Sequence, residues 1–226
     1  MEISGKRYAG VHVDHQPNQA EGVLFSNCVF VGCTLAGLRD ARRFAVRGIR
    51  LSRCKSQGSV VGPVFLEDCE VNGLETVGHD LTFHDTAFRH VSLLGDIGHV
   101  QIRTRLAAVS TPARWSRISA ENTAYYESVD WALDISRARF KDCEIEGVPC
   151  RLIRRDSESQ VVISRKSLAA SGWRKVAFGQ THYSLAIEGF LASGDEDRIL
   201  VAPRRDRRFP ELVRVLEDLR RCKAAD

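Results

Sequence analysis

The stretch 133–148, LDISRARFKDCEIEGV, carries a large apolar residue at every fifth position, namely Ile135, Phe140 and Ile145. A second, smaller apolar residue lies two positions before each of them. Neither an α-helix with 3.6 residues per turn nor the two-residue alternation of a half-buried strand produces this spacing. The stretch therefore indicates an internal repeat of five residues, and such a repeat decides the fold.

The same period extends through most of residues 21–148. The larger series contains Phe25, Phe30, Leu35, Leu51, Val61, Leu66, Val71, Phe83, Phe88, Leu93, Ile135, Phe140, Ile145 and Cys150, with Ser56 as a polar interruption. The smaller series contains Val23, Cys28, Cys33, Ile49, Cys54, Ser59, Val64, Cys69, Leu81, Thr86, Val91, Leu133, Ala138, Cys143 and Val148. Stacked units of this kind share one core, and free cysteine suits the smaller slot as a small hydrophobic residue. We therefore predict that these cysteines are core residues rather than catalytic ones.

Four triads resemble the units of the pentapeptide-repeat family: Cys28-Val29-Phe30, Cys33-Thr34-Leu35, Ala138-Arg139-Phe140 and Cys143-Glu144-Ile145. The resemblance implies a short right-handed quadrilateral β-helix, a solenoid with about twenty residues per coil. The middle position mostly lacks the Asp or Asn of the family, and the register slips three times along the chain. A generic right-handed β-helix therefore stays open as the alternative.

The expected fold is mainly β and has three parts. Residues 1–20 form an N-terminal lead-in with a short strand at 8–13. Residues 21–148 form the β-helix, interrupted by an inserted segment at about 94–130. Residues 149–226 form a small α/β extension.

The predicted elements of the extension follow from local patterns. Strands are expected at 151–155, 160–165 and 198–202, and helices at 167–175 and 182–192, with a further helix near 120–128 in the inserted segment. In the helix at 182–192, Leu185, Ala186 and Phe190 lie at helical spacing. A polar turn cluster, residues 156–159, separates the first two strands.

The chain ends in a predicted amphipathic helix. Phe209-Pro210 opens it, since proline is favoured at the first helical position. Its apolar stripe contains Leu212, Val215, Leu216, Leu219 and Cys222. An open solenoid end exposes strand edges and must be covered, so the helix is expected to cap the solenoid. The alternative is a surface for a partner or for self-association.

Composition favours a cytoplasmic protein without a cofactor. The 226 residues carry 33 Lys and Arg against 29 Asp and Glu, which gives a net charge of +4. The first residues have no apolar run of the signal-peptide type, and no segment is apolar enough to span a membrane. The seven cysteines form no CxxC pair, which indicates free thiols in a reducing compartment. The sequence has no GxxxxGK[ST], GxGxxG or GxSxG motif, so we expect no enzymatic activity.

Histidine and carboxylate groups offer weaker candidates. His79, His84, His90 and His99 fall within 21 residues, and the five-residue register places His84 and His90 outward. No metal-binding spacing such as HExxH accompanies them, so surface or structural roles are expected. Asp195-Glu196-Asp197 is interpreted as a solvated turn. Asp142 and Glu144 are placed on an outer face with no partner evident from the sequence.

Arginine clusters are the strongest candidate surface for a partner or for nucleic acid. The candidate residues are Arg39, Arg42, Arg43, Arg47, Arg50, Arg53, Arg204, Arg205, Arg207 and Arg208. Residues 39–55 alone carry a net charge of +6. Guanidinium groups bind carboxylates and phosphates bidentately. No aromatic ladder accompanies these arginines, so a solvated face is the simpler interpretation.

The sequence thus favours a non-enzymatic protein-binding module, with a bacterial immunity or defence-complex role as the suggestion from fold analogy. Some pentapeptide-repeat proteins modulate DNA topoisomerases by mimicking duplex DNA, which requires a strongly acidic surface. Residues 1–110 carry 12 Lys and Arg against 11 Asp and Glu, which does not suit such a mimic. A nucleic-acid binder acting through the arginine clusters and a carbohydrate-active β-helical enzyme complete the alternatives.

Overall fold

The computed structural model describes residues 1–13, 21–36, 43–103 and 112–226. The described chain is mainly β, and most of its strands run in parallel through a curled sheet with the order β1-β4-β8-β11-β14-β12-β9-β6-β3, beside which β7, β10 and β13 form a second parallel sheet. We call the strands β1 to β16 the parallel stack. They are β1 (Glu2–Ser4), β2 (Arg7–Ala9), β3 (His12–Val13), β4 (Leu24–Ser26), β5 (Val29–Val31), β6 (Thr34–Leu35), β7 (Ala45–Arg47), β8 (Arg50–Gln57), β9 (Val60–Val61), β10 (Phe65–Glu67), β11 (Glu70–Thr76), β12 (Leu81–His84), β13 (Ala87–Arg89), β14 (Val91–Arg103), β15 (Leu133–Ile145) and β16 (Ile153–Arg154).

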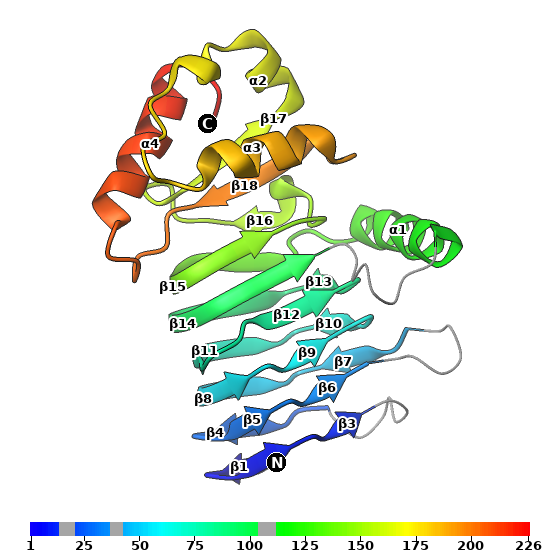
Figure 1. Ribbon diagram of the computed structural model, residues 1–226. Helices are drawn as coiled ribbons and strands as arrows, with labels where there is room; N and C mark the ends of the chain where they lie inside the picture. Colours follow the sequence, from blue (N-terminus) through cyan, green and yellow to red (C-terminus); the bar gives the residue numbers. More distant parts are fainter. Residues whose placement is uncertain (14–20, 37–42, 104–111) are drawn as a thin grey trace.

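Strand pairing in the parallel stack repeats at nearly constant sequence separation. Glu70, for example, pairs with Arg50 on one side and with Ser92 on the other. Most Cα partners are 19 to 26 residues apart in sequence, which corresponds to about four five-residue units. Figure 1 shows the result, with the first strands at one end of the stack and β16 at the other.

Left-handed backbone conformations mark the bends of the chain, both between strands and inside the long strands β8 and β14. They recur at five-residue spacing, as at Gly48, Arg53 and Gly58 and again at Asp85, His90 and Gly95, all with φ between 51° and 67°. Glycine adopts this conformation without strain, and Asn and Asp tolerate it better than other residues. The five-residue period thus describes the bends as well as the core.

Both apolar series point into the parallel stack. Phe83, Phe88, Ile135 and Phe140 are at most 7% exposed, and most of the smaller series is buried beside them, with Cys33 and Ile49 half-buried. Burial raises the pKa of the Cys54, Cys69 and Cys143 thiols, so these cysteines pack as neutral side chains. In the first turns Phe25 and Phe30 are only half-buried and contact Tyr8.

Three predicted boundaries were wrong. Residues 1–13 are no lead-in, because β1, β2 and β3 pair in register with β4, β5 and β6, and the strand expected at 8–13 is split between β2 and β3. The inserted segment does not begin at 94, because β14 continues to Arg103 with Ile97 and Ile102 buried. The extension does not begin at 149, because β16 still pairs with β15.

The helix of the inserted segment is α1 (Pro112–Glu127), longer than the expected 120–128. It lies at the side of the parallel stack (Figure 1). Buried Ile118 and Tyr126 anchor it, and the Tyr126 hydroxyl accepts a hydrogen bond from the Phe88 backbone N–H at 3.3 Å. Pairing partners in β14 and β15 are therefore 42 to 43 residues apart instead of about 20.

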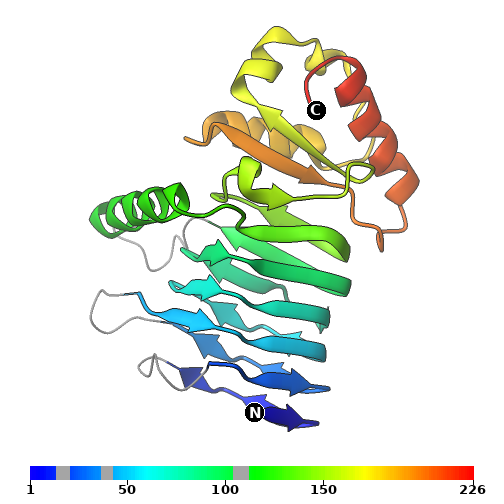
Figure 2. The same ribbon diagram turned by 180° about the vertical axis from the view of Figure 1, so that it is seen from behind.

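Residues 155–226, the C-terminal unit, fold around their own core. The elements are β17 (Gln160–Ser164), α2 (Arg165–Ala170), the 3₁₀ turn η2 (Trp173–Lys175), α3 (Tyr183–Ala192), β18 (Asp197–Val201) and α4 (Phe209–Arg221). The expected helix at 167–175 is split at Ser171-Gly172, and the expected strand at 151–155 begins as the 3₁₀ turn η1 (Cys150–Leu152). Figure 2 shows the unit at the end of the stack opposite the N-terminus.

A two-stranded antiparallel sheet, rather than the terminal helix, covers the end of the parallel stack. In β17 and β18, Val162, Ile199 and Val201 pack on the core of the stack. The alternate residues of both strands face the other way and pack on the helices. The apolar stripe of α4 is buried there, with Leu212, Val215, Leu216 and Leu219 at most 3% exposed. The prediction of a capping helix is therefore corrected, because α4 lies one layer away from the open end.

Candidate functional site

Two of the four described arginines in the first cluster, Arg43 and Arg47, bind other side chains of the same chain. The side chain of Arg43 is only 2% exposed and lies over the Phe65 ring, and its guanidinium donates to Asn122 Oδ1 of α1 at 2.6 Å. Arg47 donates to Glu67 Oε2 at 2.5 Å. Arg50 and Arg53 are exposed. Arg39 and Arg42 lie outside the described residues.

The second arginine cluster holds the C-terminal unit together and in place. Arg204 contacts Asp156 and Glu158, each at 2.6 Å. Arg205 reaches the parallel stack, where it pairs with Glu75 at 2.7 Å and donates to the Ile97 carbonyl. Arg208 pairs with Asp206, and Arg207 is exposed. With Arg43, which lies 3.9 Å from Glu121, five of the eight described candidate arginines are thus ion-paired within the chain.

The four histidines lie in different environments. His84 is buried beside Asp85, so its predicted outward position was wrong, and His79 is exposed. His99 lies 3.8 Å from Asp142. Among the described residues, no group of three His, Cys, Asp or Glu side chains is arranged to hold a metal ion.

His90 bridges two carboxylates at the point where the chain returns from α1 to β15. Its Nδ1 lies 3.0 Å from Asp68 Oδ1 and its Nε2 lies 2.7 Å from Asp130 Oδ1, while its ring stacks on Trp131. The hydrogen bond to Asp130, with a further contribution from Asp68, raises the pKa of His90 and outweighs partial burial. The same contact lowers the pKa of Asp130.

We expect His90→Gln to destabilise the protein more at about pH 5.5 than at about pH 8.5. Because the contacts with Asp130 and Asp68 raise the pKa of His90 in the folded state, they stabilise the protein fully below the pKa of His90 in the unfolded chain. This stabilisation is lost as the pH rises through the folded-state pKa. Urea unfolding at both pH values measures the difference, with exposed His79→Gln as the control. A loss of stability that is the same at both pH values would contradict this assignment.

A groove of about 1780 Å³ lies between the parallel stack and the C-terminal unit. The end of β15 and the loop after it line one side, and α1 contributes Ser119, Asn122 and Thr123. The opposite side consists of α3, the turn after it and β18. Three segments that are distant in sequence therefore build one concave surface.

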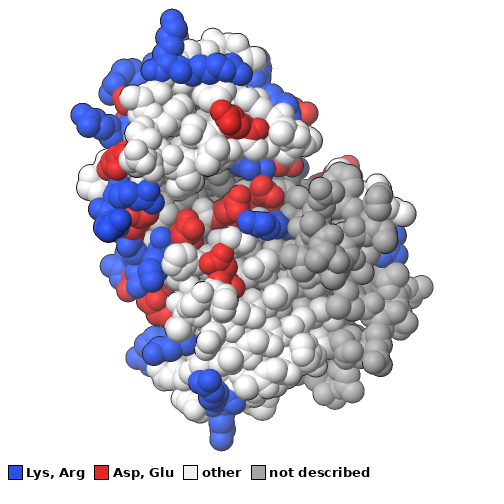
Figure 3. Space-filling model, in the orientation of Figure 1, with Lys and Arg blue, Asp and Glu red and all other residues white. Residues whose placement is uncertain are grey.

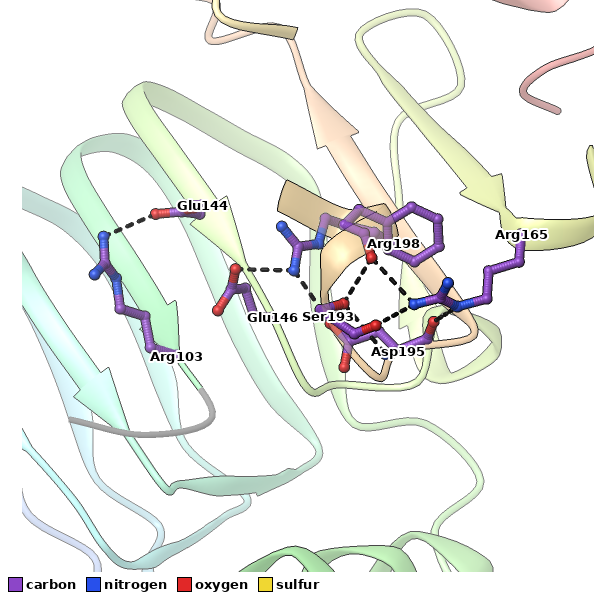
Figure 4. A network of polar contacts seen from close by, with 8 residues as sticks. Arg103, Glu144, Glu146, Arg165, Ser193, Asp195 and Arg198 are labelled. Atoms are coloured by element: carbon purple, nitrogen blue, oxygen red, sulfur yellow. Dashed lines mark hydrogen bonds and ion pairs between the residues drawn. The ribbon is translucent and has the colours of Figure 1, made fainter. Parts of the chain in front are cut away.

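Arg198 connects the two units at the groove (Figure 4). Its guanidinium lies 2.9 Å from Glu146 Oε1 of the stack and 3.1 Å from Asp195 Oδ2, and its side chain is only 7% exposed. Burial raises the pKa of Glu146, and Arg198 opposes that shift. Asp197 adds a second connection by accepting the Cys150 backbone N–H at 3.3 Å.

Arg165 fixes the turn that follows α3. Its guanidinium donates to the carbonyl oxygens of Phe190, Leu191, Ser193 and Asp195, at and after the end of the helix, where carbonyl groups lack partners from a following turn. Figure 4 shows Arg165 and Arg198 on either side of Asp195. The C-terminal side of the groove is therefore rigidly held.

Carboxylates dominate the groove. Its lining contains eight Asp and Glu side chains against five Lys and Arg: Glu127, Asp142, Glu144, Glu146, Asp195, Glu196, Asp197 and Asp206 against Arg103, Lys141, Arg151, Arg198 and Arg208. The whole chain, in contrast, has a net charge of +4. Figure 3 shows acidic side chains gathered in the middle of this face, with Lys and Arg along its left edge.

An exposed apolar side chain stands on the α3 side of the groove. Leu185 is 72% exposed, and small Ala186 and Gly189 line the groove beside it. The buried face of α3 consists instead of Tyr183, Ile187 and Phe190. Of the residues predicted at helical spacing, Leu185 is therefore wrong as a core position, whereas Phe190 is buried and Ala186 packs partly against the same core.

The carboxylates of the groove could be identified in the sequence, but their arrangement in space could not be predicted from it. Asp142 and Glu144 lie on β15, Asp195 and Glu196 lie between α3 and β18, and Asp197 begins β18; the stretch is not simply a solvated turn, because Arg198 pairs with Asp195 and Asp197 accepts the Cys150 backbone N–H. Only the folding of the C-terminal unit over the last turn of the stack brings the two stretches into one groove. The charge excess of a groove cannot be recognised before its walls are known.

No protein-family model matches the chain, and no characterised protein or solved structure shows significant similarity to it. In the part of the chain that the structure describes, no helix has the length and apolar character needed to cross a membrane.

Proposed function

We propose that this protein is a non-enzymatic protein-binding module whose binding site is the groove between the parallel stack and the C-terminal unit. The groove itself carries the proposal: it is large, and charged contacts between the two units hold its walls. A rigid surface lowers the entropic cost of binding, since less freedom is lost when a partner associates. The exposed Leu185 supplies an apolar contact of the kind found at interface centres.

We also propose that the parallel stack is a short β-helix of the pentapeptide-repeat type. The separation of about 20 residues between pairing partners, the burial or half-burial of both five-residue series and the left-handed bends at five-residue spacing support this assignment. A role in a bacterial immunity or defence complex is compatible with such a module.

The nucleic-acid alternative receives less support. Most of the described candidate arginines are occupied by carboxylates of the same chain. The groove between the two units carries an excess of negative charge, which repels phosphate groups. Binding through a protein interface is the simpler proposal.

Site-specific photocrosslinking in cell lysate tests the proposed function. A photoreactive amino acid replaces Leu185 in the groove or, as the control, Val77, which is 50% exposed on the parallel stack. We expect Leu185 to capture a discrete protein that Val77 does not, also after nuclease treatment. The captured protein must then form a complex with the purified module. Equal capture at both positions, or loss of capture with nuclease, would contradict the proposal.

A further inference from the structure

We propose that the groove selects a basic amphipathic segment of its protein partner, with Lys or Arg side chains on the carboxylates and an apolar side chain on Leu185. This inference rests on the proposed function and names the chemistry of the partner. Charge complementarity carries it, because the groove is acidic in a chain that is basic as a whole. Complementary charge raises association rates and excludes partners of the wrong sign.

Part of the negative charge is available to a partner. Arg103 pairs with Glu144, Arg198 with Glu146 and Asp195, and Arg208 with Asp206. Glu127 and Glu196, in contrast, are exposed groove residues whose carboxylates have no ion-pair partner among the described residues. Four groove carboxylates, Glu127, Asp142, Glu196 and Asp197, thus have no Lys or Arg partner among the described residues, against two groove cations, Lys141 and Arg151, that have no carboxylate partner there.

The apolar side of the groove makes the selection more specific. Leu185 extends from α3, and the small side chains of Ala186 and Ala192 leave room along the same helix. A purely cationic ligand would leave Leu185 in water. A segment that carries basic and apolar residues on one face contacts both kinds of surface.

Fluorescence anisotropy with synthetic peptides tests the selection. The probes are an amphipathic Lys/Leu peptide, a Lys/Ser peptide with the same lysine positions and a Glu/Leu peptide. We expect the Lys/Leu peptide to bind most tightly, the Lys/Ser peptide more weakly and the Glu/Leu peptide not at all. Binding of the Lys/Leu peptide should weaken with salt, because the exposed charges are screened.

Charge reversal in the groove distinguishes binding of the peptide to the groove carboxylates from attraction to the net charge of the whole protein. The double variant Glu127→Lys, Glu196→Lys should weaken Lys/Leu binding by about tenfold, since two attractive contacts become repulsive. The matched control is Glu70→Lys, Glu217→Lys, which changes the net charge equally at exposed positions outside the groove. Leu185→Ser should weaken binding of the Lys/Leu peptide but not of the Lys/Ser peptide. Thermal unfolding confirms that each variant is folded.

Two results would overturn the inference: equal weakening by the groove and control double variants, or equal binding of the Lys/Leu and Glu/Leu peptides. The photocrosslinking experiment distinguishes this failure from failure of the proposed function. If Leu185 captures a protein through a segment that is not basic, the groove is a binding site and the charge selection is wrong. If Leu185 captures nothing specific, the proposed function itself fails.

Discussion

Phe140→Ala is expected to lower the free energy of unfolding by about 3–5 kcal/mol. Phe140 is 1% exposed at the centre of β15, and its Cα partner Ile97 is equally buried in β14. Removing the ring leaves a cavity between stacked strands that hydrogen-bond to one another and cannot collapse freely. Urea unfolding of the variant measures the loss.

Lys141→Ala is the matched control, because Lys141 is the exposed neighbour of Phe140 on the same strand. Its change in stability should stay within about 0.5 kcal/mol. A similar loss for both variants would contradict the inward register of the five-residue series.

Gly98→Ala is expected to destabilise the protein by up to about 3 kcal/mol through overpacking. A Cβ atom at Gly98 would lie 2.4 Å from the backbone nitrogen and 2.3 Å from Oγ1 of Thr76 in the adjacent strand β11. Thr76 Oγ1 also accepts the His99 backbone N–H at 2.7 Å, so the side chain cannot simply rotate away. The shift must involve the backbone of β11, and thermal unfolding measures its effect.

The control for Gly98 is Gly189→Ala in α3. No heavy atom outside the local backbone lies within 4 Å of a Cβ built there. Since alanine is the better helix former, this variant should gain up to about 1 kcal/mol. If both variants were destabilised alike, close strand packing at Gly98 would not be the cause.

The core of the parallel stack could be predicted from the sequence because burial there repeats with a fixed period. Phe83, Phe88 and Ile145 are buried as their positions in the series require. The last helix was also predictable, since the apolar residues on one side of α4 are sufficient to define it. Glycine, asparagine and aspartate at the left-handed bends carried the same period, and that signal was missed.

Other features of the fold and of the groove could not be predicted, because they depend on contacts between residues that are distant in sequence. Residues 1–13 look unremarkable alone, and they become strands because the next turn pairs with them. Arg43 and Arg205 look like surface charges, yet carboxylates and carbonyls distant in sequence bind them. The groove required the placement of the C-terminal unit, which depends on the packing of β17 and β18 on the stack and on the ion pairs of Arg198 and Arg205 across the junction.

The location of the binding site can be tested directly by NMR. Amide resonances of the isotope-labelled protein are recorded while the Lys/Leu peptide is added. The account predicts shift changes concentrated in residues 141–147 and 183–197, with little change in strands β1 to β6. Changes confined to β1 to β6, or spread evenly over the surface, would contradict the assignment of the groove as the binding site.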